Sequence, residues 1–159
     1  RDPHRFLHSV PTRRSSDLAS LAVKSCTYTC RIATDPAAAL FSRPYTCVVN
    51  ESLDLESMQQ AAQLLIGTHD FAAFSNGRTR KSTVRTVETI KINREDQLIQ
   101  IQLTANSFLR HMPQLLAGTI LTAGKEKKTD RTTLTLAGVE SAAPACPSHA
   151  FTLTDVQLR

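Results

Sequence analysis

Hydrophobic and polar residues alternate along several stretches of this chain, and the period of the alternation predicts strands. The clearest case is 98–104, where Ile99, Ile101 and Leu103 face one side and polar side chains the other. Three further stretches rich in β-forming residues are predicted as strands at 22–32, 84–93 and 151–158. A shorter strand is expected at 45–49, and the polar turn after 93 predicts a hairpin with 98–104.

A helical period replaces this alternation after residue 53. Asp54 is a candidate N-cap, and Gly67 is placed to end the helix. Apolar residues recur between them at helical spacing, at Leu55, Met58, Ala62 and Leu65. We therefore expect an amphipathic helix between residues 54 and 67.

A second helical stripe follows residue 106. Asn106 or Ser107 is the expected cap, and the apolar stripe consists of Phe108, Met112, Leu115 or Leu116, and Ile120. Pro113 falls inside this predicted helix, where it removes a backbone hydrogen bond at a cost of about 3 kcal/mol. We therefore expect a kink there. Residues 125–140 are polar and rich in threonine, which predicts at most a short, weak helix.

The predicted order is β-β-α-β-β-α-(α)-β. Such an order favours the α+β class, with an antiparallel or mixed sheet and helices packed on one of its faces. The chain has 159 residues and 41% hydrophobic content, which suits one domain with a core of its own.

Charge is concentrated at the start of the chain. The formal net charge is +5, of which residues 1–18 supply +2 through four Arg and two Asp, leaving +3 for the rest. Residues 1–18 show no helical or strand period and resemble translated adaptor sequence, so we interpret them as non-native or disordered. A native disordered basic arm is the alternative. The domain is expected to occupy 19–159.

The composition also bears on compartment and metals. No apolar run approaches the roughly 18 residues of a membrane span, so we expect no membrane partner and a cytoplasmic location. The four cysteines lack the density of a disulfide framework and are expected as free thiols. Cys26 with Cys30, and Cys146 with His149, are considered as zinc ligands, but nothing completes the set. We expect no metal and no cofactor.

Two polar groups invite functional interpretations. Arg78, Arg80, Lys81 and Arg85 form a basic run that suits either RNA phosphates or a solvated loop. His69 and Asp70 are adjacent, but no nucleophile motif accompanies them. We interpret that pair as side chains whose hydrogen bonds hold a loop.

Four stretches of the chain, taken in order, carry a resemblance to a known family: KSCTYTCRI, LDLESMQQAAQLLIGTHDFAAF, VRTVETIKI with LTANSFLRHMPQLLAGTILTAG, and CPSHAFTLTDVQL. They resemble the TruA family of tRNA pseudouridine synthases. That family has a strand with an active-site tyrosine, a helix followed by Gly-x-His-Asp-Phe-x-x-Phe, a Phe-Leu-x-His-Met-Val-Arg helix, and an ending Ala-Pro-Ala-His-Gly-Leu-x-Leu-x-x-Val. The resemblance implies the carboxy-terminal part of a pseudouridine synthase catalytic domain, without its amino-terminal half.

The resemblance also implies a reaction. Family members convert uridine to pseudouridine in the anticodon arm of tRNA without metal or organic cofactor, using a nucleophilic aspartate in an Arg-Thr-Asp-Ala-Gly segment. A base must leave the stack before such a carboxylate reaches it. This chain contains no such segment, so we expect a fragment without turnover. Tyr28 takes the place of the active-site tyrosine, and an ordinary strand aromatic is the alternative.

Two departures from the family pattern affect the predicted pocket. Pro113 and Gln114 stand in place of Val-Arg, so the arginine that pairs with the aspartate is replaced by a neutral amide. Arg110 lies one helical turn earlier and is a candidate to compensate. Phe151 stands in place of Leu and is expected to wall the substrate pocket.

Four questions stay open at this stage. His111 is either a substrate contact or a packed helix residue. The departures keep a second function open, a catalytically dead RNA-binding or structural homologue. The family also leaves open a homodimer and an organellar rather than cytoplasmic location.

Overall fold

A six-stranded mixed sheet and two helices make up the described part of the chain, which in this computed structural model comprises residues 23–37, 39–40, 43–75, 82–125 and 144–158. The helices are α2 (Leu55–Leu65) and α3 (Met112–Lys125). The strands are β1 (Val23–Ala33), β2 (Cys47–Val48), β3 (Gly67–Asp70), β4 (Val84–Glu95), β5 (Leu98–Ala105) and β6 (Phe151–Leu158). Short 3₁₀ turns occupy Arg43–Tyr45, Ala72–Phe74 and Ser148–Ala150.

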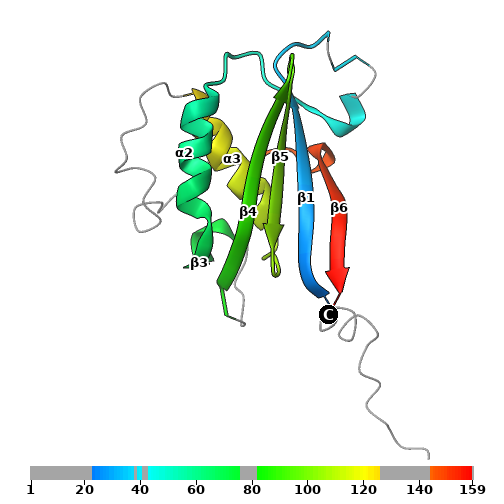
Figure 1. Ribbon diagram of the computed structural model, residues 1–159. Helices are drawn as coiled ribbons and strands as arrows, with labels where there is room; N and C mark the ends of the chain where they lie inside the picture. The colour runs from blue at the N-terminus through cyan, green and yellow to red at the C-terminus, as the bar shows by residue number, and fades with distance from the viewer. Residues whose placement is uncertain (1–22, 38, 41–42, 76–81, 126–143, 159) are drawn as a thin grey trace, which may run out of the picture.

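The long strands form an antiparallel sheet in the spatial order β4-β5-β1-β6 (Figure 1). Each helix connects two strands that run parallel with a third strand between them: α2 connects β1 to β4, and α3 connects β5 to β6. The order β1-α2-β4-β5-α3-β6 is the βαββαβ arrangement of ferredoxin-like folds. The short β2 adds a parallel pair at the end of β1, which makes the sheet mixed. The predicted α+β class is confirmed.

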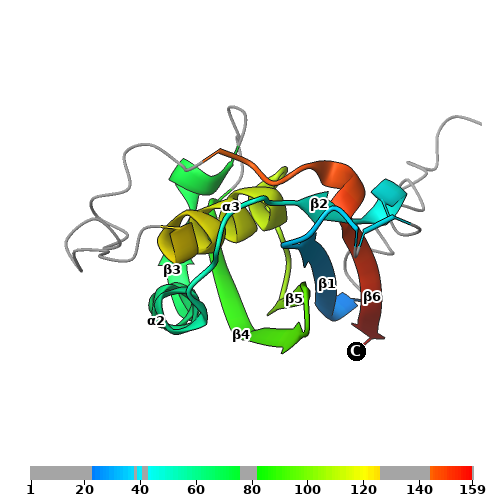
Figure 2. The same cartoon turned by 90° about the horizontal axis from the view of Figure 1, so that it is seen from above.

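The core lies between the sheet and the two helices, with α3 lying across the sheet (Figure 2). Alternation along β5 determines which side chains enter it, because every second residue from Ile99 to Ala105 is buried. The predicted hairpin is also confirmed, since β4 and β5 pair from Val87 and Ala105 to Glu95 and Leu98. No helix in the described ranges is long and apolar enough to cross a membrane.

The first helix begins where its sequence predicts. Asp54 is the N-cap, and its carboxylate accepts hydrogen bonds from the backbone N–H groups of Glu56 and Ser57. The helix ends at Leu65, two residues before Gly67. Gly67 has a φ of +117°, a backbone conformation that is strained for a residue with a side chain. The sequence analysis predicts no strand directly after this helix. Gly67–Asp70 instead forms β3, because β4 offers it a free edge for pairing.

The second helix differs more from the prediction. It begins at Met112 and not at Asn106 or Ser107. His111 has a φ of +62°, which no α-helix accommodates. Pro113 therefore lies in the first turn of the helix. A backbone N–H there would have no acceptor within the helix, so its absence in proline costs no helical hydrogen bond. The predicted kink at Pro113 is wrong for this reason.

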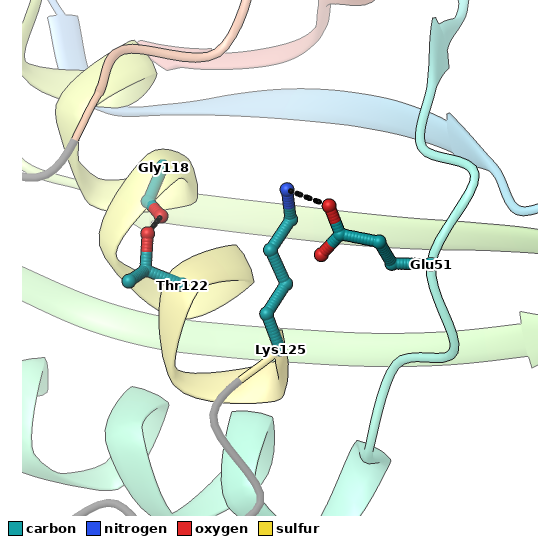
Figure 3. A network of polar contacts seen from close by, with 4 residues as sticks. All are labelled: Glu51, Gly118, Thr122 and Lys125. Carbon is teal, nitrogen blue, oxygen red and sulfur yellow. Dashed lines mark hydrogen bonds and ion pairs between the residues drawn. The ribbon is translucent and has the colours of Figure 1, made fainter.

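The far end of α3 is tied to the segment that precedes α2. Lys125 Nζ lies 3.3 Å from Glu51 Oε1 (Figure 3). Within the helix, Thr122 donates its hydroxyl to the carbonyl oxygen of Gly118 at 2.9 Å. Both members of the ion pair are exposed, so the pair contributes less than about 1 kcal/mol to stability.

The strand expected at 45–49 is confirmed only as the two-residue β2, and most of the weak helix expected at 125–140 lies outside the described residues.

Candidate active site

A pocket of about 410 Å³ opens beside the first turn of α3. Its volume lies in the range of small-molecule sites, which is about 300–1,000 Å³. The lining residues come from β1, from the segment before α3, from the first turn of α3 and from the start of β6: Tyr28, Phe108, Leu109, Arg110, His111, Pro113, Gln114 and Phe151. The structure thus brings together five residues that the sequence analysis selects from three separate stretches, namely Tyr28, Arg110, His111, Gln114 and Phe151.

Tyr28 lines this pocket from β1. Its ring meets Phe108 edge to face, with 5.3 Å between ring centroids and an interplanar angle of 84°. Burial raises the pKa of the Tyr28 phenol above its ordinary value, and the nearby Cys26 thiol adds to the effect. At neutral pH the phenol is therefore protonated and able to donate a hydrogen bond.

Phe108 is a pocket residue that the sequence analysis missed. The helical stripe assigned it to the packed face of α3, but residues 106–111 form a connection and not a helix. Asn106 shapes this connection, because its side-chain oxygen accepts from the backbone N–H of Ser107 at 2.7 Å and of Thr86 at 3.2 Å. An Asn that caps a strand end is the one sequence signal for this loop.

His111 and Gln114 form the polar rim of the pocket. His111 Nδ1 donates to Gln114 Oε1 at 2.8 Å. The backbone carbonyl of Gln114 accepts from the N–H of Cys146 at 3.1 Å, which joins α3 to the segment leading into β6. Gln114 is thereby held by both its side chain and its backbone.

The permanent charge among the described lining residues of the pocket is positive only. Arg110 is the one permanently charged residue among those that line it, and none of them carries a carboxylate. No ion pair of Arg110 is found within the described ranges. The pocket as it stands offers aromatic walls, a phenol, an amide and a cation. The described lining residues include no carboxylate nucleophile.

The predicted RNA-binding run is only partly visible. Arg78, Arg80 and Lys81 lie outside the described residues. Arg85 lies in β4, and its guanidinium donates to the backbone carbonyls of Ser82 at 2.9 Å and Val84 at 2.7 Å. Part of its hydrogen-bonding capacity is therefore used to fix its own strand.

The His69–Asp70 pair holds local backbone. His69 Nε2 contacts the carbonyl oxygen of Ile66 at 3.1 Å, and Asp70 accepts from the N–H of Ala72 at 3.1 Å and from the hydroxyl of Thr83. The His69 side chain contacts the backbone before β3, and the Asp70 side chain accepts hydrogen bonds from residues that follow β3. This geometry agrees with the interpretation of the pair as loop-fixing.

Cys30 and Cys146 lie close together, a pair that the sequence analysis does not predict. Cys30 Sγ lies 3.6 Å from Cys146 Sγ in the core, while Cys26 hydrogen-bonds elsewhere. A hydrogen bond with Cys30 raises the pKa of the Cys146 thiol to about 12, and a hydrogen bond with Cys146 raises that of Cys47. Thiols with raised pKa values are poor nucleophiles and poor metal ligands. Within the described ranges, no group of three or more His, Cys, Asp or Glu is arranged to hold a metal ion.

Comparison with known proteins identifies sequences that this chain resembles. The family model described as tRNA pseudouridine synthase matches residues 61–157. The chain is similar to "tRNA pseudouridine synthase A 1" of Clostridium tetani, with 39% identity over 105 residues, which is 65% of this chain and 43% of the relative. It is also similar to "tRNA pseudouridine synthase A" of Halalkalibacterium halodurans, with 33% identity over 135 residues, or 82% of this chain and 51% of the relative. The chain thus spans about half the length of these relatives.

Proposed function

Because the chain belongs to the tRNA pseudouridine synthase family, we propose that it forms the uridine-binding side of a site that isomerises uridine to pseudouridine in the anticodon arm of tRNA. The observation that carries the proposal is the single pocket lined by Tyr28, Arg110, His111, Gln114 and Phe151. Three separate stretches of the sequence contribute to it. A common pocket for these residues is what a substrate site requires.

The chemistry of the lining suits a flipped-out base. Uracil is flat, and the rings of Tyr28, Phe108 and Phe151 offer apolar surface for it to stack upon. Its polar edge needs hydrogen-bonding partners, which the Gln114 amide and His111 supply. The protonated phenol of Tyr28 is suited to donate a proton or a hydrogen bond during the reaction.

The nucleophile is expected to come from outside the matched region. No lining residue in the described part of the chain carries a carboxylate, and the chain covers 43% to 51% of these two relatives. We therefore expect the 159-residue chain alone to show no turnover. Detectable product from the chain alone would contradict this account of the nucleophile.

Arg110 is our candidate for the cation that keeps the incoming aspartate ionised. The family arginine is replaced by Gln114, whose amide is already engaged by His111. Arg110 lines the same pocket and has no ion pair within the described ranges. In a completed enzyme, Arg110→Ala is expected to lower activity at least tenfold. Activity equal to that of the parent would refute its role.

The decisive experiment uses a completed protein. The part of the Clostridium tetani relative that this chain does not match is fused upstream of it, and tritium release from uracil-labelled tRNA is measured. Tyr28→Ala is expected to abolish release. Tyr45→Ala is the matched control, because Tyr45 is 61% exposed and lies outside the pocket. No release by the parent chimera would refute the enzyme assignment.

The second candidate function is an RNA-binding or structural homologue without catalysis. The neutral Gln114 favours it, because an unpaired aspartate would be poorly stabilised at this site. Arg78, Arg80, Lys81 and Arg85 are our candidates for contacts with RNA phosphates under either function. Tight tRNA binding without turnover in the chimera would select this second function. We expect action in the cytoplasm, with an organelle as the alternative, and a homodimer is a further expectation.

A further inference from the structure

His111 has a strained backbone at the rim of the pocket. Its φ of +62° lies in the left-handed region, which residues with a side chain rarely adopt. Within the described ranges the other such residue is Asp96, in the turn between β4 and β5. Strain of this kind is concentrated at tight turns and active sites. The turn accounts for Asp96, whereas His111 lines a pocket, so its strain points to a function of its side chain.

The hydrogen bond with Gln114 determines which nitrogen of the His111 ring carries the proton. Nδ1 donates to Gln114 Oε1 at 2.8 Å, so in the neutral ring Nδ1 is protonated and Nε2 carries the lone pair. Nε2 has no hydrogen-bond partner within the described ranges. Because His111 lines the pocket, this lone pair is available to a ligand there.

Gln114 is suited to fix this tautomer. Its backbone carbonyl accepts from the N–H of Cys146 at 3.1 Å, and the carbonyl of His111 accepts from the N–H of Leu115 at 3.1 Å, so both residues are held in the first turn of α3. The arginine that the family has in place of Gln114 offers hydrogen-bond donors only and could not accept from Nδ1. The departure from the family pattern therefore gives the histidine an orienting acceptor.

The conversion of uridine to pseudouridine requires a base at C5 of uracil. The bond between ribose C1′ and N1 breaks and a bond between C1′ and C5 forms, which leaves C5 with both its hydrogen and the ribose. The C5–H bond then breaks, and its proton goes to a base while its electron pair forms the C5–C6 double bond. The former C6–N1 double bond gives its electron pair to N1, which takes up a proton. A side chain that accepts a proton near neutral pH suits this step.

The other polar side chains of the described lining are poorly suited to accept that proton. Burial raises the pKa of the Tyr28 phenol above its ordinary value, so at neutral pH the phenol is protonated and acts as a donor. Arg110 is a permanent cation, and the amide of Gln114 is not basic. Within the described lining, Nε2 of His111 is therefore the atom best able to take up a proton.

We propose that His111 is the general base that removes the C5 proton of uracil, with Gln114 as its positioning residue. This proposal rests on the proposed function. The Tyr28 phenol supplies the proton that N1 takes up, and proton transfer from His111 to the phenolate through solvent restores both side chains. The acid and the base of the reaction thus come from two different walls of the pocket, β1 and the segment before α3.

Nitrogen NMR of the 159-residue chain tests the tautomer without any turnover. At a pH where the His111 ring is neutral, Nδ1 is expected to be protonated and Nε2 unprotonated. Gln114→Met removes the acceptor and is expected to shift the ring toward the form protonated at Nε2. Gln60→Met, at an exposed position of α2, is the matched control and should leave the ring unchanged. A protonated Nε2 in the unsubstituted chain would overturn the proposal.

Chemical rescue of the chimera described above tests the base itself. His111→Gly suits the local φ and leaves space for imidazole from solution. This variant is expected to release tritium from C5 of uracil about 100-fold more slowly than the parent, and added imidazole to raise its rate about tenfold. His149→Gly, at an exposed position outside the pocket, should keep the parental rate with and without imidazole. A slow His111→Gly that imidazole does not accelerate would overturn the proposal.

An isotope effect separates a base from a merely structural residue. With deuterium at C5 of uracil, His111→Gln and Gln114→Met are expected to show a larger isotope effect than the parent, because C5–H cleavage becomes rate-limiting. Slower variants with the parental isotope effect would contradict the assignment. Turnover by the parent with an equal rate in His111→Gly refutes the base alone. No release by the parent refutes the enzyme assignment and the base with it.

Discussion

The ring of Phe108 stands edge-on against the ring of Tyr28, with the ring centroids 5.3 Å apart. Phe108 comes from the connection before α3, and Tyr28 from the middle of β1, so this contact joins the two main walls of the pocket. Burial is the leading cause of the raised pKa of Tyr28.

Phe108→Ala is expected to lower the pKa of Tyr28 toward its ordinary value, because it removes part of the cover that disfavours the phenolate. The chain has two tyrosines, so the titration is measured by ultraviolet absorbance in a Tyr45→Phe background. Leu64→Ala, at an exposed position of α2, is the control and should leave the titration unchanged. An unchanged titration in Phe108→Ala would show that Phe108 does not shield the phenol.

The backbone of His111 provides a second prediction. Its φ of +62° favours glycine over any residue with a Cβ. His111→Gly is therefore expected to be more stable than His111→Ala by about 1 kcal/mol, since both lose the imidazole and only alanine keeps the strain. Urea denaturation measures the difference. At Gln60, an exposed position within α2, the order should reverse, because alanine is the better helix former. The same order at both positions would contradict the strain at His111.

Gly118 is expected to tolerate no side chain. A Cβ there would overlap the carbonyl oxygen of Pro144, which is backbone and cannot move aside cheaply. Gly118→Ala should lower the free energy of unfolding by about 1–3 kcal/mol, despite the better helix propensity of alanine.

Gly124→Ala is the matched control within the same helix. Its added Cβ would meet the Met58 side chain, with Cγ at 2.6 Å, and a flexible methionine can shift. Thermal unfolding should therefore show a smaller loss for Gly124→Ala than for Gly118→Ala. Equal losses would mean that the approach of residues 144–147 to α3 is looser than the structure indicates.

Stability is expected to fall at alkaline pH because of Cys146. Its pKa is about 12 in the folded protein, against 9.0 ordinarily, mainly because of its hydrogen bond with Cys30. Between these values the unfolded state has lost the proton and the folded state keeps it, so the free energy of unfolding decreases as pH rises. The stabilising contribution is complete below pH 9 and disappears toward pH 12. One such group changes stability by up to about 1.4 kcal/mol per pH unit.

Urea denaturation of the reduced protein at pH 8 to 11 measures this decline. Cys146→Ala lacks the titrating thiol, so its decline is expected to be shallower than that of the parent. Cys26→Ala serves as a comparison outside the pair, because burial and not a thiol partner is the main cause that raises the pKa of the Cys26 thiol. Parallel curves for the parent and Cys146→Ala would exclude Cys146 as the source.

The sequence by itself determined the elements whose pattern is local. Alternation in 98–104 predicted β5, and the cap at Asp54 placed α2, because these signals depend on neighbouring residues alone. The family motifs also selected five of the residues that line the pocket, but not Phe108. Only the tertiary structure decided where α3 begins, because the positive φ of His111 is held by the surrounding fold and leaves no periodic signal.

The same limit applies to pairing across the sheet. The pairing of β3 with β4, and of Leu153 with Tyr28, depends on which edges the fold leaves open. The hydrophobic pattern of 151–158 predicted a strand but not that its apolar residues would lie uncovered beside the pocket. Burial is a property of the whole assembly of elements, so the exposure of Leu153, Val156 and Leu158 became visible only once the sheet order was known.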